Sequence, residues 1–209
     1  MKKINRKDFP TNSEDSLKFE IPSWDQTYSL LLELANAVQK SGFIPDVIVG
    51  ISRGGWIPAR IISDLLEIPK LANIAVEFYE GVAKTKHKPV ITQPVSVSVE
   101  NKKVLLVDDL TDTGKSLSLV NSHLNAKGAL EIKIATIYHK PWSRIVPHYY
   151  QKETQNWIIF PWEIKETIRK IVEDYKNKGK SIEYSKEKLI SSGLNKELTK
   201  RVVKEIFGE

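Results

Sequence analysis

Two adjacent carboxylates, Asp108 and Asp109, follow a short apolar run and precede a cluster of hydroxyl groups and a glycine. The apolar run, 103–107, has the composition of a buried strand, so the acids are expected at its exposed carboxyl end. Backbone N–H groups and hydroxyls at the start of the following helix attract phosphate. Carboxylates beside a phosphate would repel it unless they bind sugar hydroxyls or a bridging Mg²⁺. The pattern therefore predicts a site for a sugar phosphate and a metal ion.

We call this segment the phosphate turn, and its expected binding residues are Asp108, Asp109, Thr111, Asp112, Thr113, Gly114, Lys115 and Ser116. A nucleotide-binding P-loop also contains Gly-Lys-Ser, but it requires a further glycine upstream at a fixed spacing. That glycine is absent here, so the P-loop interpretation is excluded.

A second glycine turn, 52–55, follows another β-branched run at 46–51. Its paired glycines permit the backbone to approach a ligand closely. In sheets built from alternating strands and helices, ligands bind beyond the carboxyl ends of the strands. The two turns are therefore expected to face the same crevice.

The phosphate turn resembles the phosphoribosyl pyrophosphate motif of type I phosphoribosyltransferases, in which two acids precede Thr-Gly and a small hydroxyl residue. Turn 52–55 resembles that family's pyrophosphate loop, where a strained, often cis, peptide directs amides toward the leaving group. The resemblance implies Mg²⁺-assisted pyrophosphate binding by Ser52, Arg53, Gly54 and Gly55. It implies that Asp108 and Asp109 hold the ribose hydroxyls, directly or through the metal, with Asp109 as metal ligand. Residues 111–116 would bind the 5′-phosphate, and Asp112 would accept a proton at the N7 edge of a purine.

Residues further along the chain resemble the base site of the bacterial xanthine-guanine members of this family, and the similarity covers about 24–163. There the resemblance implies that Lys140 donates to the 6-oxygen and that Trp157 stacks on the base beside Ile158. Aromatic faces gain dispersion energy against any purine. The helical stretch 164–209 has no counterpart in those enzymes, but archaeal purine enzymes with helical extensions have a similar layout, and some accept adenine. The base is therefore left open between a 6-oxopurine and adenine.

The elements that position these residues follow from hydrophobic periodicity. Helices are expected at 24–41, 57–66, 116–124 and in three segments after residue 163, and strands at 46–51, 103–107 and 132–138. This alternation predicts an α/β fold, the type I phosphoribosyltransferase fold, with a mainly parallel twisted sheet flanked by helices and an all-helical C-terminal extension. The predicted domains are 1–163 and 164–209. Residues 79–94, rich in lysine and proline, are expected to form a mobile loop that closes over the site.

The composition is typical of a soluble globular protein and excludes several classes of function. The 209 residues include no cysteine and four scattered histidines, which excludes disulfides and cysteine-bound zinc. No apolar run approaches the length of a membrane span, and no signal peptide follows Met1, so a cytoplasmic protein is expected. The formal charge of +6 is modest.

Together these features predict a purine salvage phosphoribosyltransferase, acting as a homodimer. Its substrates would be phosphoribosyl pyrophosphate and a purine base, and its products a nucleoside monophosphate and pyrophosphate. The alternative is a non-catalytic transcriptional regulator that senses phosphoribosyl pyrophosphate with the same fold. Residues 163–209 carry a net charge of only +3, so nucleic-acid binding is not expected.

Overall fold

The computed structural model describes residues 18–80 and 87–207 and divides the chain into two compact units. The larger unit comprises Tyr28–Gln155, and the smaller comprises Asn156–Glu209 together with the N-terminal residues up to Thr27. Among the described helices, none combines the length and the apolar composition that crossing a bilayer requires.

The larger unit is built on a six-stranded sheet with the strand order β4-β3-β2-β5-β6-β7. In that order the strands are β4 (His87–Gln93), β3 (Leu71–Glu80), β2 (Val47–Ser52), β5 (Lys103–Thr111), β6 (Glu131–His139) and β7 (Tyr149–Glu153). All neighbouring strands are parallel except β3 and β4. The predicted α/β fold with a mainly parallel sheet is confirmed.

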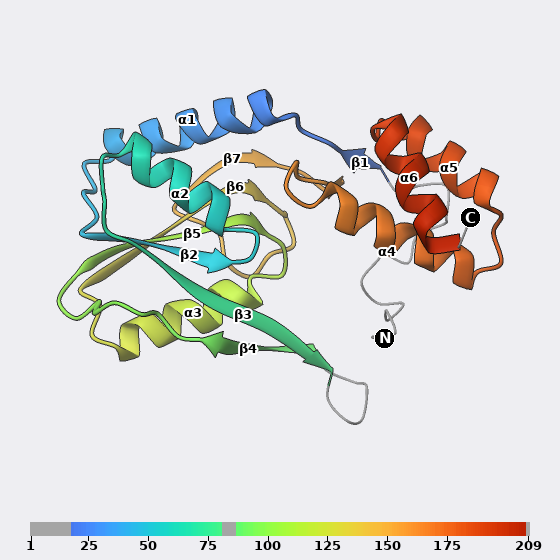
Figure 1. Cartoon of the computed structure of the whole chain (residues 1–209). Helices are drawn as coiled ribbons and strands as arrows, with labels where there is room; N and C mark the ends of the chain where they lie inside the picture. Colours follow the sequence, from blue (N-terminus) through green and yellow to red (C-terminus); the bar gives the residue numbers. More distant parts are fainter. Residues whose placement is uncertain (1–17, 81–86, 208–209) are drawn as a thin grey trace. The chain divides into compact units, whose positions relative to one another are not determined.

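Helices cover both faces of this sheet: α1 (Trp24–Lys40) and α2 (Trp56–Leu65) lie on one face and α3 (Lys115–Ala126) on the other (Figure 1). The central strand β5 is consequently buried on both sides, and residues 104–107 have no exposed surface. A strand buried on both faces reads as a continuous apolar run, which is why the sequence revealed it. The buried centre of the sheet carries the phosphate turn and turn 52–55 at its carboxyl edge.

Strand β5 is longer than the sequence predicted, because it continues through Asp108 and Asp109 to Thr111. Its ladder with β6 persists in the pairs Leu110–Tyr138 and Thr111–His139. The two acids therefore stand on the last residues of a strand instead of in a turn. Backbone pairing holds this segment even though its side chains are polar.

The loop predicted at 79–94 is also corrected, because most of its described residues belong to strands. Strand β3 runs to Glu80, and β4 pairs with it antiparallel in a register that places Phe78 opposite Pro89. Proline lacks a backbone donor and is tolerated here because β4 is the edge strand of the sheet. Residues 81–86, between the two strands, lie outside the described residues.

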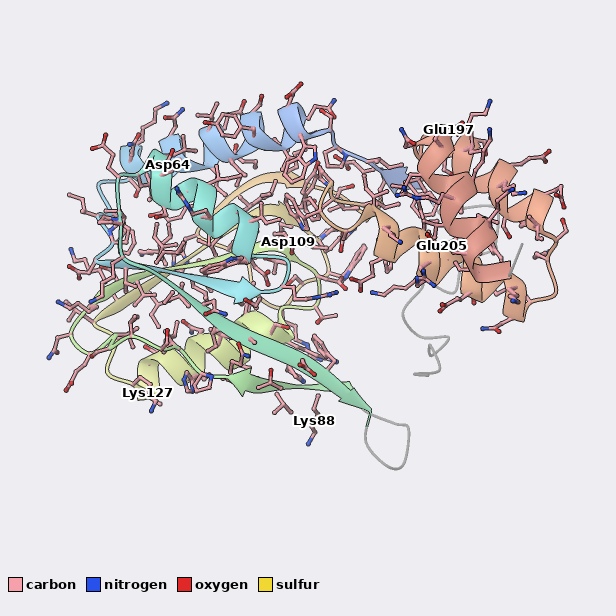
Figure 2. All side chains as sticks on the ribbon, viewed as in Figure 1. Asp64, Lys88, Asp109, Lys127, Glu197 and Glu205 are labelled. Atoms are coloured by element: carbon pink, nitrogen blue, oxygen red, sulfur yellow. The ribbon has the colours of Figure 1, made fainter. Side chains whose placement is uncertain are left out.

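The smaller unit combines a two-stranded parallel sheet with three helices. Its elements are β1 (Phe19–Glu20), β8 (Trp157–Ile158), α4 (Ile164–Asn177), α5 (Ile182–Ser191) and α6 (Lys196–Phe207). Apolar side chains of all three helices share one core with Ile159. Glu205 of α6, which is labelled in Figure 2, forms ion pairs with Lys165 and Arg169 of α4 at 3.2 and 3.0 Å. The helical C-terminal extension is confirmed. The smaller unit contains more than the predicted segment 164–209, because it also takes in residues 156–163 and an N-terminal segment.

Candidate active site

The acid pair packs directly against the glycine turn 52–55, because β2 and β5 are neighbouring parallel strands whose carboxyl ends meet. A Cβ placed on Gly54 would lie 2.6 Å from Cγ of Asp109, and one on Gly55 would lie 2.5 Å from the carbonyl oxygen of Val107. At Gly55 the contact is with backbone atoms, so glycine is required there, whereas at Gly54 the contact is with a side chain that would have to turn away. Asp109 lies at this edge of the sheet (Figure 2). The two motifs found separately in the sequence thus form one site.

The two carboxylates occupy an unfavourable electrostatic environment. Burial raises the pKa of the Asp108 carboxyl well above its ordinary range, and the neighbouring charge of Asp109 raises it further. Hydrogen bonds from the backbone N–H groups of Asp109 and Gly55 lower the pKa of Asp108 in part. The N–H of Asp109 donates to Oδ1 of Asp108 at 3.1 Å. A cation or a set of donor hydroxyls placed here would relieve the repulsion between the two acids.

Residues 52–55 form a tight loop with a cis peptide between Ser52 and Arg53, the geometry that the resemblance describes. The Ser52 hydroxyl oxygen accepts a hydrogen bond from Nδ2 of Asn73 at 3.3 Å. The N–H of Gly55 donates to the carbonyl of Ile51 at 2.9 Å and is therefore already bonded. The contribution of Gly55 is that it lets the loop pack closely against β5. The Arg53 side chain is exposed.

The phosphate turn lines an open pocket of about 150 Å³ at the start of α3. The residues around it are Phe78, Asp108, Leu110, Thr111, Asp112, Thr113, Gly114, Lys115, Ser116 and Leu117. Gly114 occupies the N-cap position with φ of +75°, a conformation that favours glycine. Glycine offers no side chain to cap the helix, and the N–H of Lys115 makes only a long hydrogen bond of 3.5 Å to Oγ1 of Thr113, so the start of α3 can bind an anion. The position and chemistry of this pocket suit a phosphate group.

Thr111 differs from the expected role, because its hydroxyl points into the protein. Its Oγ1 donates to Oγ1 of Thr136 at 3.2 Å, and that hydroxyl donates to the carbonyl of Tyr138 at 2.9 Å. Only 1% of Thr111 is exposed. Its carbonyl accepts from the N–H of Lys140 at 2.9 Å, so Thr111 ties β5 to the end of β6. The ladder between these strands places both threonines inside the sheet, which explains the difference.

Trp142, a residue that the sequence analysis missed, contacts both Asp112 and Lys140. The indole N–H of Trp142 donates to Oδ1 of Asp112 at 2.8 Å. The Nζ of Lys140 lies 5.4 Å from the centroid of the same indole ring. Lys140 is only 5% exposed, whereas Trp142 is 53% exposed. Trp142 gave no sequence signal because nothing in its spacing links it to the phosphate turn.

The sequence and the fold are similar to those of known proteins. The phosphoribosyl transferase domain family matches residues 23–169. The xanthine-guanine phosphoribosyltransferase of Cereibacter sphaeroides is 33% identical over 149 residues, covering 68% of this chain and 85% of the relative. The chain belongs to the phosphoribosyltransferase family.

Further relatives agree with this assignment. The enzyme of the same name from Gluconobacter oxydans is 31% identical over 144 residues, covering 68% of this chain and 82% of the relative. The crystal structure of the purine phosphoribosyltransferase from Pyrococcus horikoshii OT3 shares 41% identity with a TM-score of 0.64, covering 70% of this phosphoribosyltransferase and 94% of that chain. The relatives are named as enzymes of purine substrates, so the transcriptional regulator is not favoured as an alternative.

The two remaining base-site candidates of this phosphoribosyltransferase, Trp157 and Ile158, lie in the smaller unit. They form β8, which pairs with β1. Ile158 is buried, and Trp157 packs in part against the apolar core of the C-terminal helices. Part of the Trp157 surface therefore serves packing, and its role in stacking on a base stays a prediction.

Proposed function

We propose that this phosphoribosyltransferase transfers the 5-phosphoribosyl group from phosphoribosyl pyrophosphate to a 6-oxopurine, releasing a nucleoside monophosphate and pyrophosphate. The observation that carries the proposal is the packing of the acid pair against the glycine loop, beside the pocket at the start of α3. The carboxyl edge of the sheet thus offers two candidate anion sites, turn 52–55 and the pocket at the start of α3, with the acid pair beside both. A ribose that carries phosphate groups at both ends matches this order of groups.

In the proposed complex, residues 52–55 contact the pyrophosphate, and Asp108 and Asp109 accept hydrogen bonds from the ribose hydroxyls. The 5′-phosphate occupies the pocket, where N–H groups of residues 113–116 and the dipole of α3 stabilise it. The bond between C1 of the ribose and the pyrophosphate oxygen breaks while a bond from C1 to a ring nitrogen of the base forms. Asp112 receives a proton at the N7 edge of the purine.

Mg²⁺ fits the acid pair on chemical grounds. It prefers oxygen ligands and is held in phosphate sites by one or two carboxylates together with substrate oxygens. Within the described residues no three His, Asp or Glu side chains gather into a cluster, so substrate oxygens would complete the coordination around Asp109. The ion would neutralise charge on the departing pyrophosphate.

Lys140 supports a 6-oxopurine as the acceptor. Its backbone N–H is bonded to Thr111, next to Asp112, which places the lysine at the same edge of the sheet. An ammonium group donates to a 6-oxygen in a charge-assisted hydrogen bond, whereas the 6-amino group of adenine is itself a donor. A site built for one hydrogen-bonding sense discriminates strongly against the other.

The test is nucleotide formation from phosphoribosyl pyrophosphate with hypoxanthine, guanine, xanthine and adenine in parallel. We expect the 6-oxopurines to react, and Lys140→Met to cost about 2–3 kcal/mol in kcat/KM for them. Lys127→Met removes an exposed lysine of the same unit (Figure 2) and is the matched control. Use of adenine alone would contradict the assigned role of Lys140, and no nucleotide with any base would contradict the proposed function itself.

A further inference from the structure

Trp142 contacts both residues to which the proposed function assigns the chemistry of the base. Its indole N–H bonds to Asp112 at 2.8 Å, and its ring lies 5.4 Å from the Lys140 ammonium. More than half of Trp142 is exposed, so core packing does not account for its position. Asp112 directly follows β5, Lys140 directly follows the neighbouring strand β6, and Trp142 lies in the loop after β6.

The backbone around Trp142 is fixed by local structure. Residues 140–143 form a turn in which the N–H of Ser143 donates to the carbonyl of Lys140 at 2.9 Å. Pro141 stands at the second position of this turn, where its fixed φ is favourable. The turn therefore fixes the position of the Trp142 backbone.

The loop at 143–145 packs against the phosphate turn at Gly114. A Cβ on Gly114 would lie 3.0 Å from Oγ of Ser143 and 3.1 Å from the backbone nitrogen of Ile145. Such close packing means that the loop containing Trp142 and the turn containing Asp112 hold each other in register. The hydrogen bond between the two side chains therefore joins two segments that are already in contact.

We propose that Trp142 is a positioning residue that orients Asp112 and Lys140 toward the purine, an inference that rests on the proposed function. Asp112 is exposed, and an exposed aspartate samples several rotamers unless a partner holds it. Indole N–H is a donor only, so it holds Oδ1 and leaves Oδ2 to accept the proton of the base. The face of the indole attracts the Lys140 ammonium and limits its positions. One side chain thus controls the separation between the proton acceptor and the 6-oxygen donor.

Two substitutions separate the contacts. Trp142→Phe removes the N–H but keeps a ring for Lys140, so we expect kcat to fall about tenfold with unchanged KM for the base and unchanged affinity for phosphoribosyl pyrophosphate. Trp142→Leu removes both contacts, and we expect a similar fall in kcat together with an increase of about tenfold in the KM for the base. Trp24→Phe, at another exposed tryptophan in the smaller unit, is the control and should leave both constants unchanged.

A double-mutant cycle tests whether Trp142 acts through Asp112. Asp112→Asn combined with Trp142→Phe should have the kcat of Asp112→Asn alone, because the side chain that Trp142 orients is then an amide and no longer accepts a proton from the base. Multiplicative effects in the double variant, or a wild-type kcat in Trp142→Phe, would overturn the inference and leave the proposed function intact. An increase in the KM for the base without loss of kcat would make Trp142 a stacking surface and would also overturn it. Absence of turnover in the wild type overturns the proposed function and this inference together.

Discussion

The acid pair Asp108–Asp109 and the nearby Asp112 show two ways of placing a carboxylate. The pair stands near the end of strand β5, partly buried, with Gly54 and Gly55 packed closely against it. Asp112 lies just beyond the strand, exposed, and has a hydrogen bond from the side chain of Trp142. Residues of one type in one short segment thus have different environments.

The difference bears on their proposed roles. Backbone packing positions the acid pair before any ligand arrives, which suits groups that bind ribose and metal in the ground state. A single side-chain hydrogen bond positions Asp112, which suits a group that must interact with a base as the reaction proceeds. Changes at the pair should therefore affect binding, and changes at Asp112 should affect turnover.

The largest expected effect on binding follows from Asp108→Asn combined with Asp109→Asn. We expect the affinity for phosphoribosyl pyrophosphate with Mg²⁺, measured by calorimetry, to fall about 100-fold, because the ribose hydroxyls and the metal lose charged acceptors. Asp64→Asn, at an exposed residue of α2 that pairs with Arg60 at 3.7 Å, is the control (Figure 2). Equal affinities in the double variant and the wild type would remove the acid pair from the binding site.

The glycine loop provides a smaller effect, this time on stability. Gly55→Ala should lower the free energy of unfolding by about 1–3 kcal/mol, because its Cβ would meet the backbone of Val107 at 2.5 Å. Gly54→Ala meets the side chain of Asp109, which can turn away, so it should cost less stability but weaken binding of phosphoribosyl pyrophosphate. Urea unfolding of both variants distinguishes the two cases. Equal losses of stability would mean that the loop does not pack on β5 as described.

The smallest expected effect concerns His148, away from the proposed catalytic residues. Burial and the Lys133 charge lower the pKa of His148 below its ordinary value of 6.5, although Glu131 opposes the shift. Its neutral Nδ1 accepts a hydrogen bond from the N–H of Ile134 at 3.0 Å. His148 therefore takes up a proton more readily in the unfolded chain than in the folded protein. The stability that neutral His148 contributes is fully present above pH 6.5 and is lost as the pH falls through the lowered pKa.

Thermal unfolding of wild type and His148→Gln across pH values above and below 6.5 measures this linkage. The difference in stability between the two proteins should shrink as the pH falls. A difference that is constant with pH would contradict the assigned protonation state.

The sequence predicted the sheet because Val104–Val107 forms a continuous apolar run, and it predicted the phosphate turn because acids, hydroxyls and glycine carry recognisable chemistry. It did not predict that β5 continues to Thr111, since that extension depends on pairing with β6, a long-range interaction. The inward direction of the Thr111 hydroxyl was not predicted for the same reason.

The contacts of Trp142 and Phe78 with the site were missed because they arise from tertiary packing. Phe78 lines the pocket at the start of α3 from strand β3, and nothing in the sequence around this exposed residue indicated that position. The strand β4 was missed because lysine and proline in 87–93 suggest a loop, although an edge strand tolerates both. Local patterns thus predicted the elements, and the partners of side chains required the fold.

The division between binding and turnover can be tested most directly in Asp112→Asn. On one preparation, kcat is measured with the preferred purine and the affinity for phosphoribosyl pyrophosphate is measured by calorimetry. The account predicts a kcat lower by about 100-fold with unchanged affinity, because the proton acceptor is lost while the acid pair, the glycine loop and the phosphate pocket remain. An unchanged kcat, or a loss confined to the affinity, would contradict it.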